Sequence, residues 1–190
     1  MPYCHEPGPW DMIAIMFMPM EDLWNIDARE RSLAAGEVLF RAGDPVLLLY
    51  RVETGAVRLT RPLTHGSELT LQRVRAGSLL AEASLFAAAY HCDAVAETPA
   101  RLRGIPVKRI MQALENDPAL ARALAQYLAL EVQSARARAE IVALKTVAAR
   151  LDAWLALNNG SLLPKGQWRE VAEEIGVTPE ALYRELARRR

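Results

Sequence analysis

Residues 167–186 read QWREVAEEIGVTPEALYREL, and their turn chemistry is specific enough to fix the architecture of this end of the chain. Gly176 follows a helix-forming run and stands where a left-handed residue must end a helix. Thr178 is a good N-cap for a second helix, and Pro179 fits the first position of that helix. The stretch therefore predicts two short helices joined by a tight turn.

The apolar residues of both segments repeat at helical spacing, which gives each helix one face to bury. They are Val171, Ala172 and Ile175 in the first segment and Leu182 and Leu186 in the second. The start of the second helix exposes Glu180, Tyr183 and Arg184, whose side chains suit contacts with base edges and phosphates. The pattern predicts a helix-turn-helix that binds DNA. An ordinary helical hairpin is the alternative that the pattern alone leaves open.

A long helix is predicted upstream of this motif. Asp117 and Pro118 form a helix start, and residues 119–158 contain neither Gly nor Pro. Apolar residues recur along it at Leu120, Leu124, Leu128, Val132, Ala135, Ala139 and Val142. Such a stripe is commonly a core face, but one small domain can hardly cover a helix of over about twenty residues, so we expect a coiled-coil-like dimer seam. A break within residues 141–147 would start a second helix that ends at residues 158–160.

The first half of the chain has a β texture. Between residues 33 and 105, short apolar or alternating runs are separated by turn residues. Gly43, Gly55, Gly66 and Gly77 recur at intervals of eleven or twelve residues, which fits one strand and one turn per interval. The sequence thus predicts an α+β protein with an N-terminal antiparallel β-roll of jelly-roll type.

Composition sets limits on function and location. The 23 basic and 23 acidic side chains cancel, so DNA binding must depend on a local site rather than on the whole chain. Cys4 and Cys92 are too few for a disulfide framework. The apolar residues 12–20 are too short to span a bilayer and lack a basic lead-in. We expect a cytoplasmic protein without membrane contact.

Three glycine-marked motifs precede the helix-turn-helix, and together with it they resemble the Crp/Fnr family of transcription regulators. They are Leu33-x-x-Gly36-x-x-Leu39-Phe40-x-x-Gly43-Asp44, Tyr50-x-Val52-x-x-Gly55-x-Val57-x-Leu59 and Gly77-Ser78-Leu79-Leu80-Ala81-Glu82-Ala83-Ser84-Leu85-Phe86. The resemblance covers residues 33–190. It implies a β-roll effector domain over residues 1–115, a dimerisation helix over 116–140 and a DNA-binding domain over 141–190.

The resemblance also assigns roles on the second helix of the motif. Recognition helices of the family carry Arg-Glu and, four places on, Arg. Glu180 and Arg184 match, whereas Pro179 replaces the first Arg, so we expect a different operator. Thr178, Tyr183 and Arg188 complete the predicted DNA contacts. The partners implied are a palindromic operator, a second copy of the chain and RNA polymerase. The family's wing strands would follow residue 190, so we expect a domain that lacks a full wing.

Nucleotide-binding members of the family hold the ribose and cyclic phosphate with Gly-Glu-Leu and Arg-Ser-Ala segments. Here these segments read Ala81-Glu82-Ala83 and His91-Cys92-Asp93. Glu82 is retained, but a neutral His91 is a poor partner for phosphate and Asp93 would repel it. We therefore expect no cyclic nucleotide. A different effector would bind at Glu82, Ala83, His91 and Cys92.

The cysteine and histidine residues give little support for a metal or cofactor site. Cys92 and His91 could ligate a metal or haem with Cys4 and His5, but neighbours on a strand point to opposite faces. An iron–sulfur cluster would need about four thiolates. We expect no metal, haem or cluster, and Cys92 is favoured as a core residue, with a redox-sensing thiol left open.

The sequence also carries no nucleophile elbow, phosphate loop or zinc-protease motif, so we expect no enzyme. A cupin-type metalloenzyme would need several converging histidines, and the β region holds only His65 and His91. A second alternative is a β-roll module that binds a small molecule and uses its C-terminal helices for protein contacts.

Overall fold

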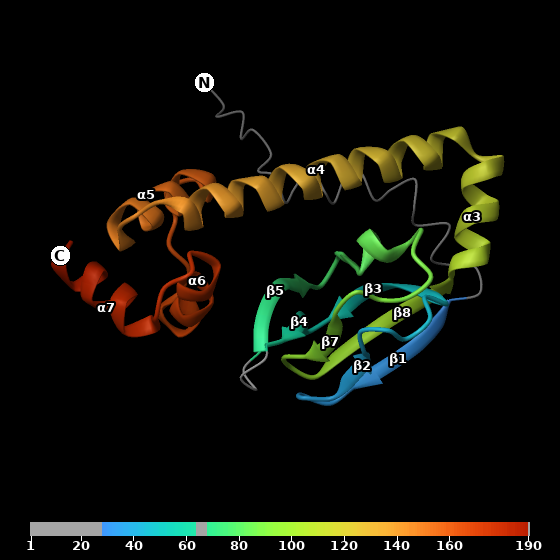
Figure 1. The fold of residues 1–190 in the computed structure, drawn as a ribbon, viewed down its shortest axis with the longest axis horizontal. Coiled ribbons are helices and arrows are strands. Elements are labelled where there is room, and N and C mark those ends of the chain that lie inside the picture. The colour runs from blue at the N-terminus through green and yellow to red at the C-terminus, as the bar shows by residue number, and fades with distance from the viewer. Residues whose placement is uncertain (1–27, 64–67, 190) are drawn as a thin grey trace, which may run out of the picture. The chain divides into compact units, whose positions relative to one another are not determined.

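The computed structural model describes residues 28–63 and 68–189. These residues divide into two compact units, one that ends at Leu128 and one that begins at Ala129. The first unit contains the strands and the second contains the C-terminal helices (Figure 1). Helix α4 (Pro118–Ala143) contributes its first turns to one unit and its last turns to the other.

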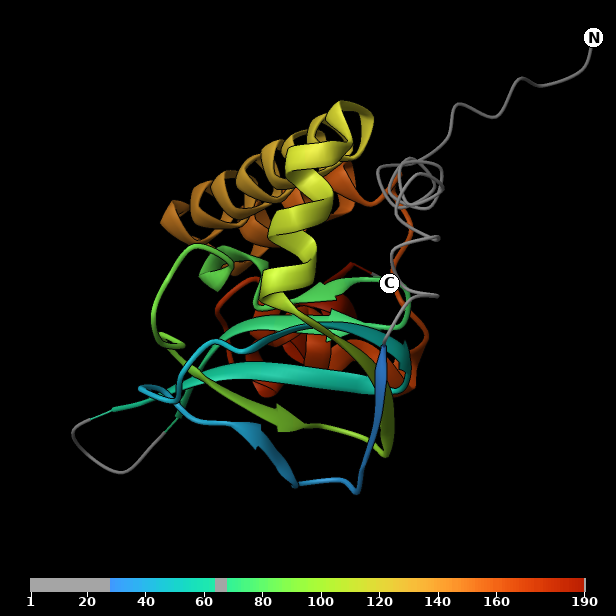
Figure 2. The ribbon, with the colours of Figure 1, turned by 90° about the vertical axis from the view of Figure 1, so that its right-hand side faces the viewer.

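Eight strands form the first unit and pair into two four-stranded antiparallel sheets. The strands are β1 (Arg29–Leu33), β2 (Val38–Phe40), β3 (Leu48–Thr54), β4 (Ala56–Pro62), β5 (Glu68–Arg75), β6 (Leu79–Leu80), β7 (Asp93–Ala96) and β8 (Ala100–Pro106). One sheet has the order β1-β8-β3-β6 and the other β2-β7-β4-β5. The two sheets face each other in the first unit (Figure 2). The predicted jelly-roll-like fold is confirmed.

Strand β1 starts four residues before the predicted β region. Its residues Arg29–Leu33 are mostly polar and exposed, because β1 lies at the edge of its sheet and pairs only with β8. Such a strand has no apolar alternation to reveal it. Four turn glycines, Gly36, Gly43, Gly55 and Gly77, adopt positive φ as the glycine rhythm requires. The predicted turn at residues 65–67 lies outside the described residues.

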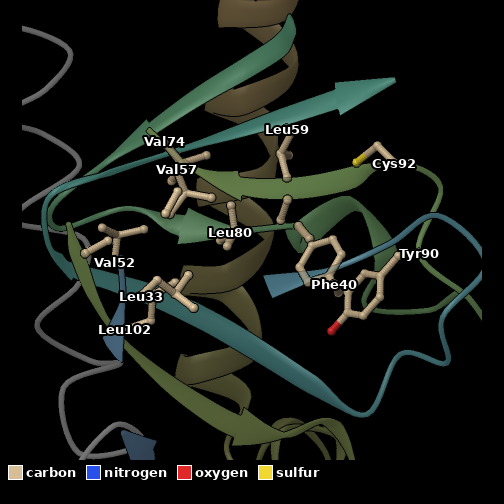
Figure 3. Close-up of a cluster of buried hydrophobic side chains, with 14 residues drawn as sticks. Leu33, Phe40, Val52, Val57, Leu59, Val74, Leu80, Tyr90, Cys92 and Leu102 are labelled. Carbon is tan, nitrogen blue, oxygen red and sulfur yellow. The ribbon is translucent and has the colours of Figure 1, made fainter. Parts of the chain in front are cut away.

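The core of the β-roll lies between the two sheets (Figure 3). Its side chains come from alternate positions of the strands, as in Val57 and Leu59 of β4, which are buried on the same face. The rings of Phe40 and Tyr90 stack with centroids 3.7 Å apart, and the Tyr90 hydroxyl donates to the Leu48 carbonyl oxygen at 2.6 Å. This filled interior makes the roll an independently packed unit.

Helices follow the strands, and the last four of them lie where the sequence predicts helices. They are α3 (Val107–Asn116), α4 (Pro118–Ala143), α5 (Val147–Leu157), α6 (Trp168–Glu174) and α7 (Pro179–Arg188). Asp117 caps α4 through bonds from the amides of Ala119 and Leu120. The predicted break falls between α4 and α5, where the Thr146 hydroxyl accepts the Ala149 amide. None of the helices in the described part of the chain is long and apolar enough to cross a membrane.

The predicted apolar stripe of α4 mixes two faces of the helix. Leu120 and Leu124 are 4% exposed, so they belong to the core and cannot meet a partner helix. Among the apolar residues of α4 that stay at least partly exposed, one set consists of Ala121, Ala125, Leu128, Val132, Ala135, Ala139 and Val142. They are spaced alternately by four and three residues, which is the spacing of a coiled-coil seam. The expected stripe is therefore corrected at its first two positions.

Candidate functional site

Helices α6 and α7 are joined by the turn that the sequence predicts. Gly176 has a φ of +64°, a left-handed conformation in which glycine is favoured. The Thr178 hydroxyl accepts the Ala181 amide at 3.2 Å, and Pro179 occupies the first turn of α7. The predicted turn residue, N-cap and helix start are all confirmed. Together they fix the direction in which α7 leaves the turn.

The buried face of this pair packs into a small core of its own. Val171, Ala172, Ile175 and Leu182 are fully buried, as their spacing predicts. They pack in one cluster with Ile141 from α4 and with Leu151 and Trp154 from α5. The Trp154 indole nitrogen also donates to a carboxylate oxygen of Glu174 at 2.8 Å, which ties α5 to α6. One face of α7 thus packs into this core, and the opposite face is exposed to solvent.

That opposite face carries the predicted DNA-contacting residues. Thr178, Glu180, Tyr183, Arg184 and Arg188 are all exposed. Because 180, 184 and 188 follow one another at intervals of four, their side chains lie along one side of the helix. Within the described part of the chain, Arg184 makes one hydrogen bond, which is a long one of 3.4 Å from its Nε to the Glu180 carbonyl oxygen. Its guanidinium is therefore accessible to a ligand.

Tyr183 is positioned by a neighbouring aromatic ring. Its ring lies 5.8 Å from that of Trp168, at an angle of 46°, and the residue remains 43% exposed. The Trp168 indole nitrogen donates to the Leu163 carbonyl oxygen at 2.8 Å, which fixes the indole. Beside these rings is a cavity of about 300 Å³, lined by Lys165, Trp168, Tyr183, Leu186 and Ala187. No local sequence pattern predicts this apolar cavity, because its lining comes from two segments.

The end of α7 is held by an ion-pair network that the sequence analysis missed. Glu185 accepts from Arg189 at 2.7 Å and lies 2.9 Å from Arg188, and these hydrogen bonds lower the pKa of its carboxyl. Arg189 also donates to Asp152 at 2.5 Å and to the Ala148 carbonyl oxygen at 3.1 Å. Arg188 remains 72% exposed at its side chain despite this pair. Arg189 therefore attaches α7 to α5, whereas Arg188 stays accessible.

The predicted effector residues lie around the 3-10 helix η1 (Glu82–Ser84) of the β-roll. Glu82 is 7% exposed, Ala83 is exposed and His91 is exposed. The His91 ring nitrogen Nδ1 lies 3.0 Å from the hydroxyl of buried Ser84, within hydrogen-bonding distance. The structure therefore brings His91 to η1, through a contact that sequence spacing could not reveal.

Cys92 points away from this surface into the core of the roll (Figure 3). It is fully buried, and this burial raises the pKa of its thiol, so the reactive thiolate is disfavoured. His91 is exposed and Cys92 is buried, so the side chains of these two neighbours face opposite ways. Among the described residues no group of His, Cys, Asp or Glu could hold a metal. Cys4, His5 and His65 lie outside the described residues.

The cyclic-phosphate position of the family is poorly suited to that ligand here. Residue 91 supplies an imidazole already engaged by Ser84, and the neighbouring Asp93 carboxylate accepts the Ala42 amide at 2.7 Å and pairs with Arg41 at 3.7 Å. Ala81, which precedes η1, adopts a left-handed φ of 62° although it is not glycine. A cyclic phosphate would have to displace the contacts that His91 and Asp93 make within the fold.

Known protein families and curated proteins include relatives of this chain. Residues 30–117, which run from β1 to the end of α3, match the family model described as a cyclic nucleotide-binding domain. The global nitrogen regulator of Synechococcus elongatus is 29% identical over 166 residues, which are 80% of this chain and 74% of that protein.

Two solved structures resemble this chain over most of its length. A CRP/FNR-family transcriptional regulator from Thermus thermophilus is 30% identical, with a TM-score of 0.61 and coverage of 85% of this chain and 87% of its own. FixK2 from Bradyrhizobium japonicum has a TM-score of 0.70 at 23% identity, covering 86% of this chain and 84% of its own. At that identity, the likeness to FixK2 shows the fold alone.

Proposed function

Since the chain belongs to the CRP/FNR family of transcription regulators, we propose that it is a homodimeric regulator that binds DNA through α7. The relatives from Synechococcus elongatus and Thermus thermophilus are named as regulators and not as enzymes. The observation that carries the proposal is the exposed face of α7, where Glu180, Tyr183 and Arg184 have no part in the core.

Each exposed side chain on α7 has a contact that suits its chemistry. Arg184 can donate two bonds to a guanine edge, and Glu180 can accept from the amino group of cytosine. Tyr183 and Arg188 lie on either side of this pair and suit the sugar–phosphate backbone, as does Thr178 at the helix N-terminus. Pro179 offers no side-chain donor, so the operator differs at the base that the family's first arginine reads.

Dimerisation is proposed along the exposed stripe of α4. The seven positions of this stripe, from Ala121 to Val142, alternate by four and three residues, and six of the seven are alanine or valine. Val132 is 49% exposed although it is apolar, which a partner helix would remedy. A two-fold dimer would place two α7 helices on palindromic half-sites about 34 Å apart, or a multiple of that.

A charge in the seam tests the dimer. Val132→Glu buries a carboxylate between the two helices, so we expect monomers in sedimentation experiments. Loss of the second half-site should weaken binding to a palindromic duplex by about 10²–10⁴-fold. Gln133→Glu is the matched control, because residue 133 is exposed and lies off the stripe. Equal behaviour of the two variants would contradict dimerisation along this face.

The β-roll is proposed to sense a signal other than a cyclic nucleotide. Glu82 and His91 supply the polar groups near η1, Ala83 lies at the surface, and Cys92 contributes only to the core. Titration calorimetry with cyclic AMP should therefore give no binding heat at millimolar ligand. Binding in the micromolar range would refute this part of the proposal.

A second candidate function uses the C-terminal helices for protein contacts. The cavity beside Trp168 and Tyr183 favours it, since it could take an apolar side chain of a partner. RNA polymerase is the partner that a transcription regulator would contact there. Binding of duplex DNA by the isolated dimer, with a steep dependence on salt, favours the first function.

A further inference from the structure

One arginine contacts two chain segments that lie far from each other in the sequence. Arg150, in the first turns of α5, donates from Nε to the Leu144 carbonyl oxygen at 2.8 Å. Its Nη1 donates to the carbonyl oxygens of Ile175 at 3.1 Å and Gly176 at 2.8 Å. Leu144 lies in the break between α4 and α5, and Ile175 and Gly176 form the turn before α7. A single guanidinium therefore bridges the break and the turn.

The bonded carbonyl groups share a physical property. Helix α4 ends at Ala143 and α6 ends at Glu174, so the three acceptors directly follow helix C-termini. Carbonyl groups there lack partners within the helix and carry partial negative charge. A cation that bonds to both ends satisfies these groups and fixes the two helices with respect to each other.

Packing at the same place reinforces the contact. A Cβ atom built on Gly176 would lie 3.2 Å from Cγ1 of Val142 and 3.3 Å from Nη1 of Arg150. The turn backbone therefore rests directly on the last turn of α4 and on the guanidinium. Glycine at this position serves the left-handed turn and also leaves room for this close approach.

We propose that Arg150 is a positioning residue that fixes the α6–α7 motif against the end of α4. Where α4 forms the dimer seam, this contact sets the placement of each recognition helix relative to the two-fold axis. The DNA part of this inference rests on the proposed function. The contact itself is a property of the C-terminal unit and can be tested without DNA.

The chemistry of the contact requires arginine specifically. A guanidinium offers several N–H donors in a rigid planar fork, which can reach carbonyl groups in two directions. Lysine keeps the charge but presents it as one compact ammonium group, and glutamine is shorter, uncharged and carries both of its N–H donors on one nitrogen. Arg150→Lys and Arg150→Gln therefore form a graded series. Arg136→Lys is the matched control, because Arg136 is exposed on α4 and off the stripe.

Hydrogen exchange on the full chain provides the first readout. The amides of Leu144, Gly176 and Val177 bond to the carbonyl oxygens of Ile141, Glu173 and Ala172. In Arg150→Lys we expect these amides to exchange at least about tenfold faster together, and in Arg150→Gln faster still, while the interiors of α5 and α7 keep their protection. Faster exchange throughout residues 147–188 would contradict the proposal, because it would show that Arg150 stabilises the whole helical unit rather than the break and the turn. Unchanged exchange would also overturn the proposal.

Duplex binding provides the second readout. At fixed salt, Arg150→Lys should bind a palindromic duplex at least about tenfold more weakly, and the slope of log affinity against log salt should stay unchanged. A slope reduced by about one would mean that Arg150 contacts a phosphate directly, which contradicts a positioning role. If the wild type binds no duplex, the proposed function fails, and the exchange result alone then decides the role of Arg150.

Discussion

The segment around η1 and the exposed face of α7 both carry polar side chains that the sequence marks as functional, yet the fold uses them differently. Around η1, Glu82 is buried, Ser84 and His91 lie within bonding distance of each other, and Asp93 is engaged by Arg41 and a backbone amide. On α7, Glu180 and Arg184 are exposed and contribute nothing to the core behind them.

This difference distinguishes polar residues that have a structural role from polar residues that are available to bind a partner. A side chain that satisfies its own fold has a structural explanation, and a ligand must compete with that contact. A side chain that the fold leaves exposed on one face of a rigid helix is available to a partner. The α7 face is therefore the better-supported site, whereas a ligand at η1 would have to compete with the contacts that His91 and Asp93 already make.

The largest expected effect comes from removing a core leucine in each unit. Leu182→Ala in the helical unit and Leu80→Ala in the β-roll should each cost about 2–5 kcal/mol of unfolding free energy, because both side chains are fully buried. If the two units are independently packed, hydrogen exchange should accelerate only in the unit that carries the substitution. Equal acceleration of exchange in both units would contradict independent packing, because the two units would then unfold together.

A smaller effect is expected at the turn before α7. Gly176→Ala and Gly160→Ala both place a methyl group at positive φ, which costs roughly 1–2 kcal/mol in each case. Only at Gly176 would the new Cβ crowd Val142 and Arg150, since nothing lies within 4 Å of the Cβ position at Gly160. Chemical denaturation should show a larger loss for Gly176→Ala. An equal loss would mean that the turn is not pressed against α4.

The smallest effect concerns the response to acid, where the two units can be compared through one carboxylate each. Hydrogen bonds from Arg189 and Arg188 lower the pKa of Glu185 from its ordinary value of about 4.5, and a bond from Arg73 lowers that of Glu97 in the β-roll. A lowered folded-state pKa gives stability that is present above the ordinary value and is lost as the pH falls through the folded-state value.

Glu185→Gln should therefore weaken the helical unit at neutral pH and flatten its loss of stability below about pH 4.5. Glu97→Gln should do the same for the β-roll alone. The measurement is the thermal midpoint of each unit between neutral pH and pH 3. A Glu185→Gln profile that still falls as steeply as the wild type would show that the network around Arg189 does not hold α7.

Features of the fold and of the site that depend on residues close together in the sequence could be predicted from local sequence patterns. The left-handed Gly176, the Thr178 cap and the helix break near Thr146 depend on residues a few positions apart, and all three were predicted correctly. The sheet glycines belong to the same class, because a tight turn is specified within a few residues.

Contacts between distant segments could not be predicted in this way. The Arg150 bonds to the turn span 25 and 26 residues, and the Arg189 bond to Asp152 spans 37. The stripe of α4 was misplaced at Leu120 and Leu124 because periodicity shows which residues are apolar but not which face the core takes. The polar strand β1 was missed because its pairing with β8, rather than any apolar alternation, makes it a strand.

The central claim is that the exposed face of α7 binds and reads duplex DNA, and a salt titration of binding by the wild type and Arg184→Ala tests it most directly. The wild-type affinity should fall linearly and steeply on a plot of log affinity against log salt. Arg184→Ala should lose about 1–3 kcal/mol on the preferred operator and relax the choice of base at one position. No binding by the wild type at low salt, or identical binding of operator and random duplex by both proteins, would contradict the claim.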